Sequence, residues 1–145
     1  PESLLEGIYH CATMEQTGKG EPLSPDKWRN KGEGARVVIV FTDAPFKDPM
    51  AEPKGGTLDD LANVCEANRI ILQVFAPKMD CYYELGEIDK ADCHLFPFDE
   101  ANPEGPIKAL NEITSEKGYF MDALRDSLGA LATTLSAEVE VDGIL

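Results

Sequence analysis

Basic residues are scarce in this sequence, with 13 Lys and Arg against 27 Asp and Glu in 145 residues and a formal net charge of −14. Binding to a nucleic acid depends on cationic side chains that neutralise phosphates, so this balance argues against a nucleic-acid partner. An anionic membrane surface is disfavoured for the same reason. A cation or a basic protein surface is attracted instead.

Long apolar runs are also lacking, because none approaches the roughly 20 residues that a membrane-spanning helix needs. No signal peptide is present either. The sequence opens on Pro1-Glu2-Ser3 without a methionine, as a processed or truncated product does. The compartment therefore stays unassigned from this end of the chain.

Cysteines are few and do not form metal-binding motifs. Cys11, Cys65, Cys81 and Cys93 include no CxxC pair, and no histidine stands at zinc-ligand spacing, so a zinc site is not expected. Cys11 and Cys65 lie on the apolar faces of expected helices, where a free cysteine behaves as a small buried hydrophobe. This usage favours a reducing, cytoplasmic compartment.

Catalytic signatures are missing too. The sequence contains no GxSxG, P-loop or GxGxxG motif, and its only histidines, His10 and His94, have no evident nucleophile as a neighbour. The acidic pairs Asp59-Asp60 and Asp99-Glu100 lie among other charges and are typical of a solvated face. We therefore expect a binding protein rather than an enzyme.

The amino-terminal third predicts one helix and one long loop. Ser3 and Glu6 have the spacing of a capping box, and apolar residues recur at helical spacing over 4–14. Residues 15–34 are rich in Gly, Pro and charge, which predicts a surface loop. Trp28 is the residue expected to fix that loop to the body of the protein.

Three apolar runs predict strands that are buried on both faces. They cover 37–41, 70–75 and 94–98, and the first is mostly β-branched. Such runs are typical of a parallel sheet covered by helices. Thr57, followed three residues later by Asp60, predicts a capped helix between the first two strands.

Further helices are expected over about 81–91, capped by Asp80, then from Pro106, and in a long closing segment that contains Phe120 and regularly spaced leucines. The alternation of helices and strands predicts an α/β protein with a three-layer α/β/α, Rossmann-like plan and a mainly parallel sheet. Only three strands are visible, fewer than the five or six of a typical sheet. Residues 1–145 are therefore expected to form a single domain or the carboxyl-terminal part of one.

Asp43 is the best candidate functional residue, because Thr42-Asp43 follows the first strand and ligands collect at the carboxyl ends of parallel strands. Its carboxylate could bind Mg²⁺ or Mn²⁺, cap the next helix, or form an Asx turn. The residues alone leave these alternatives open.

Three segments resemble the later half of a von Willebrand factor type A domain: PESLLEGIYHCA, ARVVIVFTDAP and GGTLDDLANVCEANRIILQVFAP. In that family, three separate segments build a metal-ion-dependent adhesion site. They are an Asp-x-Ser-x-Ser loop, a Thr or Asp before a middle helix, and an Asp that closes a central strand. Only the last has a counterpart here, Asp43, and the other two would lie upstream of Pro1.

The resemblance implies a protein-binding module whose complete domain binds a protein partner through Mg²⁺ or Mn²⁺ at Asp43. This chain alone offers too few ligands for an octahedral ion, so we expect its own metal binding to be weak or absent. The alternative is a metal-free structural or regulatory interaction scaffold. A sheet with an unpaired edge also predicts a homo-oligomer or a complementing amino-terminal fragment.

Overall fold

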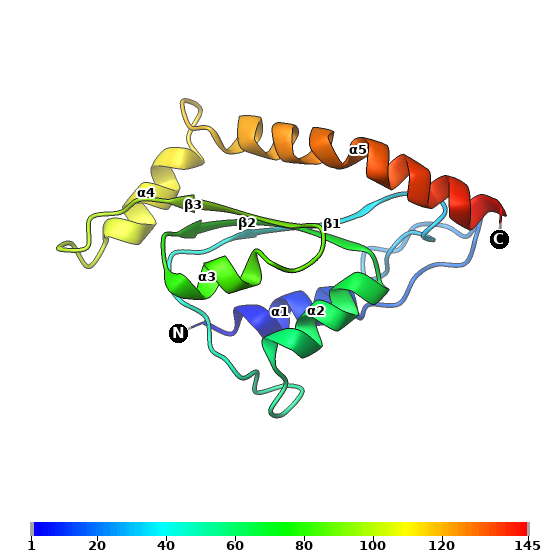
Figure 1. Ribbon diagram of the computed structural model, residues 1–145, viewed down its shortest axis with the longest axis horizontal. Helices are drawn as coiled ribbons and strands as arrows, with labels where there is room; N and C mark the ends of the chain where they lie inside the picture. Colours follow the sequence, from blue (N-terminus) through cyan, green and yellow to red (C-terminus); the bar gives the residue numbers. More distant parts are fainter. Residues whose placement is uncertain (1, 145) are drawn as a thin grey trace.

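A computed structural model describes the backbone of residues 2–144 and the side chains of residues 2–132. Within this range, five helices and three strands follow one another (Figure 1). In chain order they are α1 (Leu4–Ala12), β1 (Arg36–Phe41), α2 (Leu58–Ala67), β2 (Ile70–Pro77), α3 (Asp80–Leu85), β3 (Ala91–Phe96), α4 (Gly105–Ile113) and α5 (Phe120–Ile144).

The strands form a parallel sheet in the order β1-β2-β3. Val38 lies beside Leu72 in the register of the first pair, and Leu72 lies beside Ala91 in the second. Every residue of the central strand β2 is buried. This confirms the α/β class and the parallel sheet, and it explains why β2 consists almost entirely of apolar residues.

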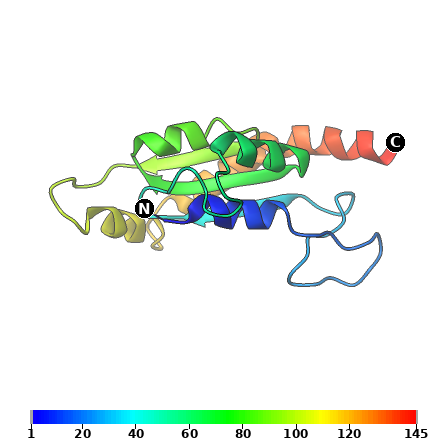
Figure 2. The ribbon, with the colours of Figure 1, turned by 90° about the horizontal axis from the view of Figure 1, so that it is seen from below.

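Helices cover both faces of the sheet. In Figure 1, α5 lies above the strands while α1, α2 and α3 lie below them, and Figure 2 shows the last three on the near side of the sheet. The larger core cluster joins the α1, α2 and α3 side to residues such as Leu72 and Val74. A second cluster on the opposite face packs Phe75, Phe96 and Ile113 against α4 and the start of α5. The arrangement is Rossmann-like.

Helix α1 begins without the predicted capping box. The Ser3 side chain makes no cap hydrogen bond. The Glu6 Oε1 atom instead accepts a hydrogen bond of 2.7 Å from the backbone N–H of Ala51, in the loop that follows β1. That prediction was therefore wrong, because a tertiary contact takes the carboxylate that local capping needs.

Two predicted boundaries also shift around α3. The helix ends at Leu85 rather than near residue 91, because Gly86 follows and glycine weakens a helix. Lys90 then adopts a left-handed backbone with φ of 60°, which turns the chain back toward the sheet. Pairing with β2 begins at Ala91, so β3 starts three residues before the predicted His94.

The long loop between α1 and β1 is fixed by Trp28, as the sequence predicts. The Trp28 indole N–H donates a hydrogen bond of 2.7 Å to the Cys11 carbonyl at the end of α1. Its backbone N–H donates to the carbonyl of Glu15, and Thr17 donates to the carbonyl of Trp28.

No helix in the described part of the chain is both long and apolar enough to cross a membrane.

The contrast between the starts of α1 and α2 tests whether the Thr57 capping box stabilises the fold. Thr57 forms the predicted capping box with Asp60, with hydrogen bonds of 3.2 Å and 2.8 Å, whereas Ser3 does not cap α1. We expect Thr57→Ala to lower the free energy of unfolding by about 1 kcal/mol. The matched Ser3→Ala should change it by less than about 0.5 kcal/mol. Urea unfolding of both variants measures this, and equal losses would contradict the assignment.

Candidate functional site

The carboxyl end of β1 positions the predicted residue Asp43. The Thr42 backbone N–H donates a hydrogen bond of 3.0 Å to the Phe75 carbonyl, so the ladder continues one residue past the strand. Thr42 is buried, and Asp43 is the first residue to leave the sheet, half-buried. The structure therefore places Asp43 at the edge where ligands of parallel sheets bind.

A second carboxylate reaches this end from the start of the chain. The Thr42 hydroxyl donates a hydrogen bond of 2.7 Å to Glu2 Oε2. The Glu2 backbone pairs with the loop after β1, donating to the Pro45 carbonyl and accepting from the Lys47 N–H, each at 2.9 Å. Sequence reasoning missed Glu2, because nothing local signals a contact that spans 40 positions.

Tyr82 supports the turn that carries Asp43. Its hydroxyl donates to the Ala44 carbonyl and lies 3.3 Å from the Thr42 Oγ1 atom, and its ring packs edge-on against Phe46 with centroids 5.3 Å apart. Burial raises the pKa of Tyr82 to about 12. The neighbouring Tyr83 is exposed.

The metal-ligand set at this end is small. Within the described residues, no group of three or more His, Cys, Asp and Glu side chains lies close enough together to hold a metal ion. Glu2 and Asp43 offer two carboxylates, and Mg²⁺ requires near-octahedral oxygen coordination. The residues present here therefore do not fit a complete metal site by themselves.

The outer edge of β1 is the second notable feature. Because the Thr42 N–H faces β2, alternation along the ladder directs the backbone groups of every second residue away from it. The outward-facing residues are Val37, Ile39 and Phe41. No other strand pairs with this edge among residues 2–144. Ile39 and Phe41 also keep 43% and 44% of their surface exposed, which places them among the exposed large hydrophobic residues of the described chain.

Residues 37–41 themselves carry none of the sequence features that usually protect an edge from added strands. Exposed edges are commonly blocked by Lys, Pro, a bulge or a charged side chain. The segment 37–41 is Val-Val-Ile-Val-Phe and is paired in unbroken register with β2. The opposite edge strand, β3, differs because it contains Asp92, whose side chain is half exposed.

A polar network that sequence reasoning missed lies between the sheet and α5. The fully buried Gln73 side chain meets His94 Nε2 at 2.9 Å and donates to Ser127 Oγ at 3.0 Å. Ser127 in turn donates a hydrogen bond of 2.6 Å to Asp92. The Gln73 amide stands between the histidine and the serine, so this arrangement holds α5 on the sheet and does not pair a base with a nucleophile.

Comparison with known proteins finds no matching family model, no matching curated protein and no matching solved structure. The resemblance to von Willebrand factor type A domains thus stays a prediction.

Tyr82 generates a prediction with a defined pH dependence. Its hydroxyl satisfies a carbonyl in the turn, so Tyr82→Phe should lower the free energy of unfolding by about 1–2 kcal/mol at pH 7. Tyr83→Phe, at an exposed position, is the matched control and should have little effect. Equal losses in the two variants would show that the hydroxyl of Tyr82 does not support the turn.

The same pair of variants also isolates the effect of Tyr82 ionisation on stability at alkaline pH. The ordinary pKa of 10.0 is raised to about 12 in the folded protein. Tyr82 therefore keeps its proton to a higher pH in the folded protein than in the unfolded chain. The resulting contribution to the free energy of unfolding is complete below pH 10 and is lost as the pH rises toward 12. Cys65, which is buried, and Cys93, which is partly buried, also have raised pKa values and add their own alkaline loss in every variant. Urea unfolding at pH 8 and pH 11 should thus show a smaller alkaline loss in Tyr82→Phe than in Tyr83→Phe.

Proposed function

We propose that this chain is a protein-interaction module that binds its partner by adding a β-strand to the outer edge of β1. The observation that carries the proposal is the unprotected, apolar edge formed by Val37, Ile39 and Phe41. An added strand would pair with their outward backbone groups, and its side chains would cover the exposed parts of Ile39 and Phe41. Strand addition of this kind gives affinity through main-chain hydrogen bonds.

The surrounding surface favours a polypeptide as the partner. The edge itself is uncharged, while the chain carries a formal net charge of −14, so a nucleic acid or an anionic membrane would be repelled. The exposed side chains at the edge are aliphatic and aromatic. The added strand would come from a second copy of this chain or from another segment of a complete domain.

In this proposal, Asp43 makes partner binding at the β1 edge dependent on a metal ion. The residue lies at one end of β1, so a partner that adds a strand there also brings its own side chains close to Asp43. Together with Glu2, those side chains could complete a site for Mg²⁺ or Mn²⁺. This agrees with the role that the resemblance to von Willebrand factor type A domains implies.

A metal-free interaction scaffold is the second candidate. The observation that favours it is the absence of a three-residue ligand group among the described side chains. In that case Glu2 and Thr42 simply close the turn after β1, and the β1 edge alone carries the binding. Both candidates use the same edge, and they differ in the role of Asp43.

Placing a charge on the edge tests strand addition. We expect Ile39→Lys to weaken association of the chain with itself or with a complementing segment by at least about tenfold, because a lysine opposes strand pairing at an exposed edge. Leu23→Lys is the matched control, since Leu23 is 61% exposed in the loop between α1 and β1. Sedimentation velocity over a concentration series measures self-association.

Two results of this experiment would contradict the proposal. One is a compact monomer whose outward β1 amides are fully protected from hydrogen exchange without any partner. The other is an equal loss of association in the Ile39 and Leu23 variants, which would indicate a general charge effect.

Calorimetric titration with Mg²⁺ and Mn²⁺ tests the role of Asp43. The titration compares this chain with a form extended upstream of Pro1, each beside Asp43→Ala and the control Asp48→Ala, an exposed aspartate in the same loop. We expect binding in the extended form that Asp43→Ala abolishes and Asp48→Ala preserves, because only Asp43 stands at the end of β1. Absence of metal binding in both forms would contradict the metal-dependent role of Asp43 and would favour the metal-free scaffold.

A further inference from the structure

Arg36 lies at the amino end of β1, the end away from Asp43, and its charge is poorly compensated. The residue is only 8% exposed. Its Nη2 atom donates to Gln16 Oε1 at 2.6 Å and its Nη1 atom to the Asn68 carbonyl at 3.3 Å. The buried Nε atom has no hydrogen-bond partner, and no described carboxylate forms an ion pair with this guanidinium.

This arrangement is energetically unfavourable by itself. A buried charge is normally paired with an opposite charge, and neutral acceptors compensate only part of its lost hydration. Burial and then the nearby charge of Arg69 lower the pKa of Arg36. Two of the five guanidinium donors are used by the described acceptors. An anion is the species that would complete this site.

The guanidinium borders a surface cavity of about 400 Å³. Lys31 and Arg69 also line it, together with Gln16 and Asn68. Among the described lining residues Glu15 is the single carboxylate, and it forms an ion pair of 3.6 Å with Lys27. Three cations therefore surround one cavity in a chain whose overall charge is −14.

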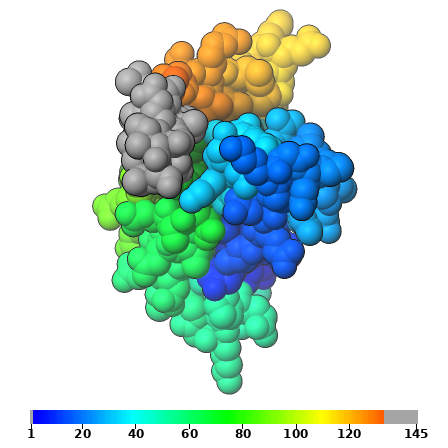
Figure 3. All heavy atoms as spheres, turned by 90° about the vertical axis from the view of Figure 1, so that its right-hand side faces the viewer, coloured from blue at the N-terminus to red at the C-terminus, as the bar shows by residue number. Residues whose placement is uncertain are grey.

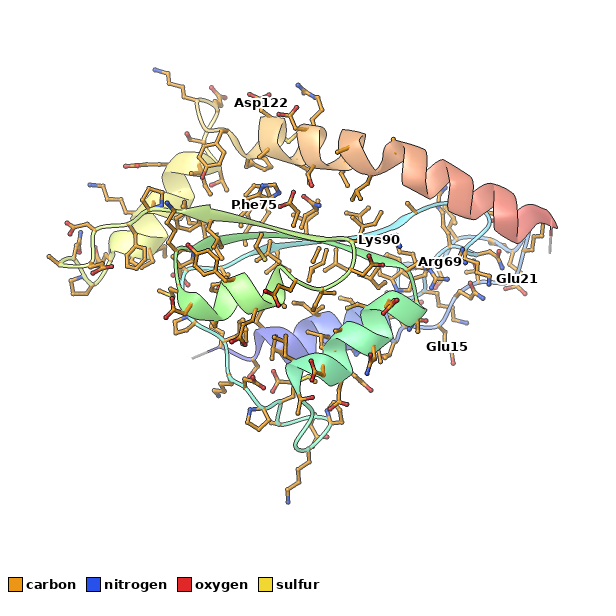
Figure 4. All side chains as sticks on the ribbon, viewed as in Figure 1. Glu15, Glu21, Arg69, Phe75, Lys90 and Asp122 are labelled. Atoms are coloured by element: carbon orange, nitrogen blue, oxygen red, sulfur yellow. The ribbon has the colours of Figure 1, made fainter. Side chains whose placement is uncertain are left out.

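Two separate parts of the chain build this cavity. Figure 3 views the molecule from this end and shows the loop between α1 and β1 (blue to light blue) beside the green atoms of the α2 and β2 region. Figure 4 labels Arg69 and Glu15 at the same end. Lys31 comes from the loop, Arg36 from β1, and Arg69 from the turn before β2, where it has a left-handed backbone with φ of 56°.

We propose that this cavity is a binding site for a small oxyanion, the phosphate or carboxylate group of a small molecule. Arg36 is its fixed donor, because Gln16 and Asn68 hold the guanidinium in place. A planar guanidinium suits phosphate and carboxylate groups, which can accept two parallel hydrogen bonds. Lys31, which is exposed on the loop, adds a flexible charge. The volume lies in the range of small-molecule sites.

Calorimetric titration of the chain with inorganic phosphate, and separately with malonate, tests this site. The ionic strength is held constant with sodium chloride, so that general screening does not change. We expect saturable binding of one anion per chain. Arg36→Lys should weaken it at least about tenfold, because one charge-assisted hydrogen bond contributes that much.

Arg36→Lys could also disturb the fold, so the decisive pair of variants lies on the loop. We expect Lys31→Gln to weaken binding several-fold and Lys19→Gln to leave it unchanged. Both lysines are exposed on the same loop, and only Lys31 lines the cavity. Far-ultraviolet circular dichroism checks that both variants keep the fold.

The two anions distinguish the source of the ligand group. Binding of both supports a general oxyanion site, whereas binding of phosphate alone or malonate alone supports a phosphorylated or a carboxylated molecule. The proposal is overturned if neither anion binds saturably, or if Lys31→Gln and Lys19→Gln weaken binding equally. None of these outcomes depends on the β1 edge.

Discussion

The structure depends on the complete burial of β2 between its two neighbouring strands and two layers of helix. A strand that is buried on both faces can bond its backbone groups only within the sheet, so β1 and β3 must flank it. The helices must also cover both faces, because Leu72 and Val74 point one way while Gln73 and Phe75 point the other. The three-layer plan follows from this one strand.

Gln73 is the exception in β2 that gives the arrangement its specificity. Apolar packing alone would tolerate small shifts of α5 along the sheet. The buried amide tolerates none, because its two ends require Ser127 of α5 and His94 of β3 at fixed positions. A buried polar group that loses its partner is costly, so the amide fixes where the helix lies.

Much of the fold was predictable from local pattern, and the site was less so. The apolar runs at 37–41 and 70–75 predicted the positions of β1 and β2, and Thr57 with Asp60 predicted the start of α2. Burial on both faces holds for β2 and was wrong for β1, because β1 is an edge strand that leaves Ile39 and Phe41 exposed. The Ser3 prediction was wrong, since Glu6 bonds to a distant loop. The position of Asp43 at the strand end was predictable. The contacts of Glu2 and Arg36 were not, because both join residues far apart in the sequence.

Trp28, the only tryptophan in the chain, makes the long loop optically visible. Its indole N–H is bonded to the end of α1, and Trp28 and Arg36 both line a second surface cavity. The emission of this single fluorophore therefore reports how the loop is seated against α1 and the core beneath it. The protein carries an intrinsic probe of its most irregular segment, and no label is needed to follow it.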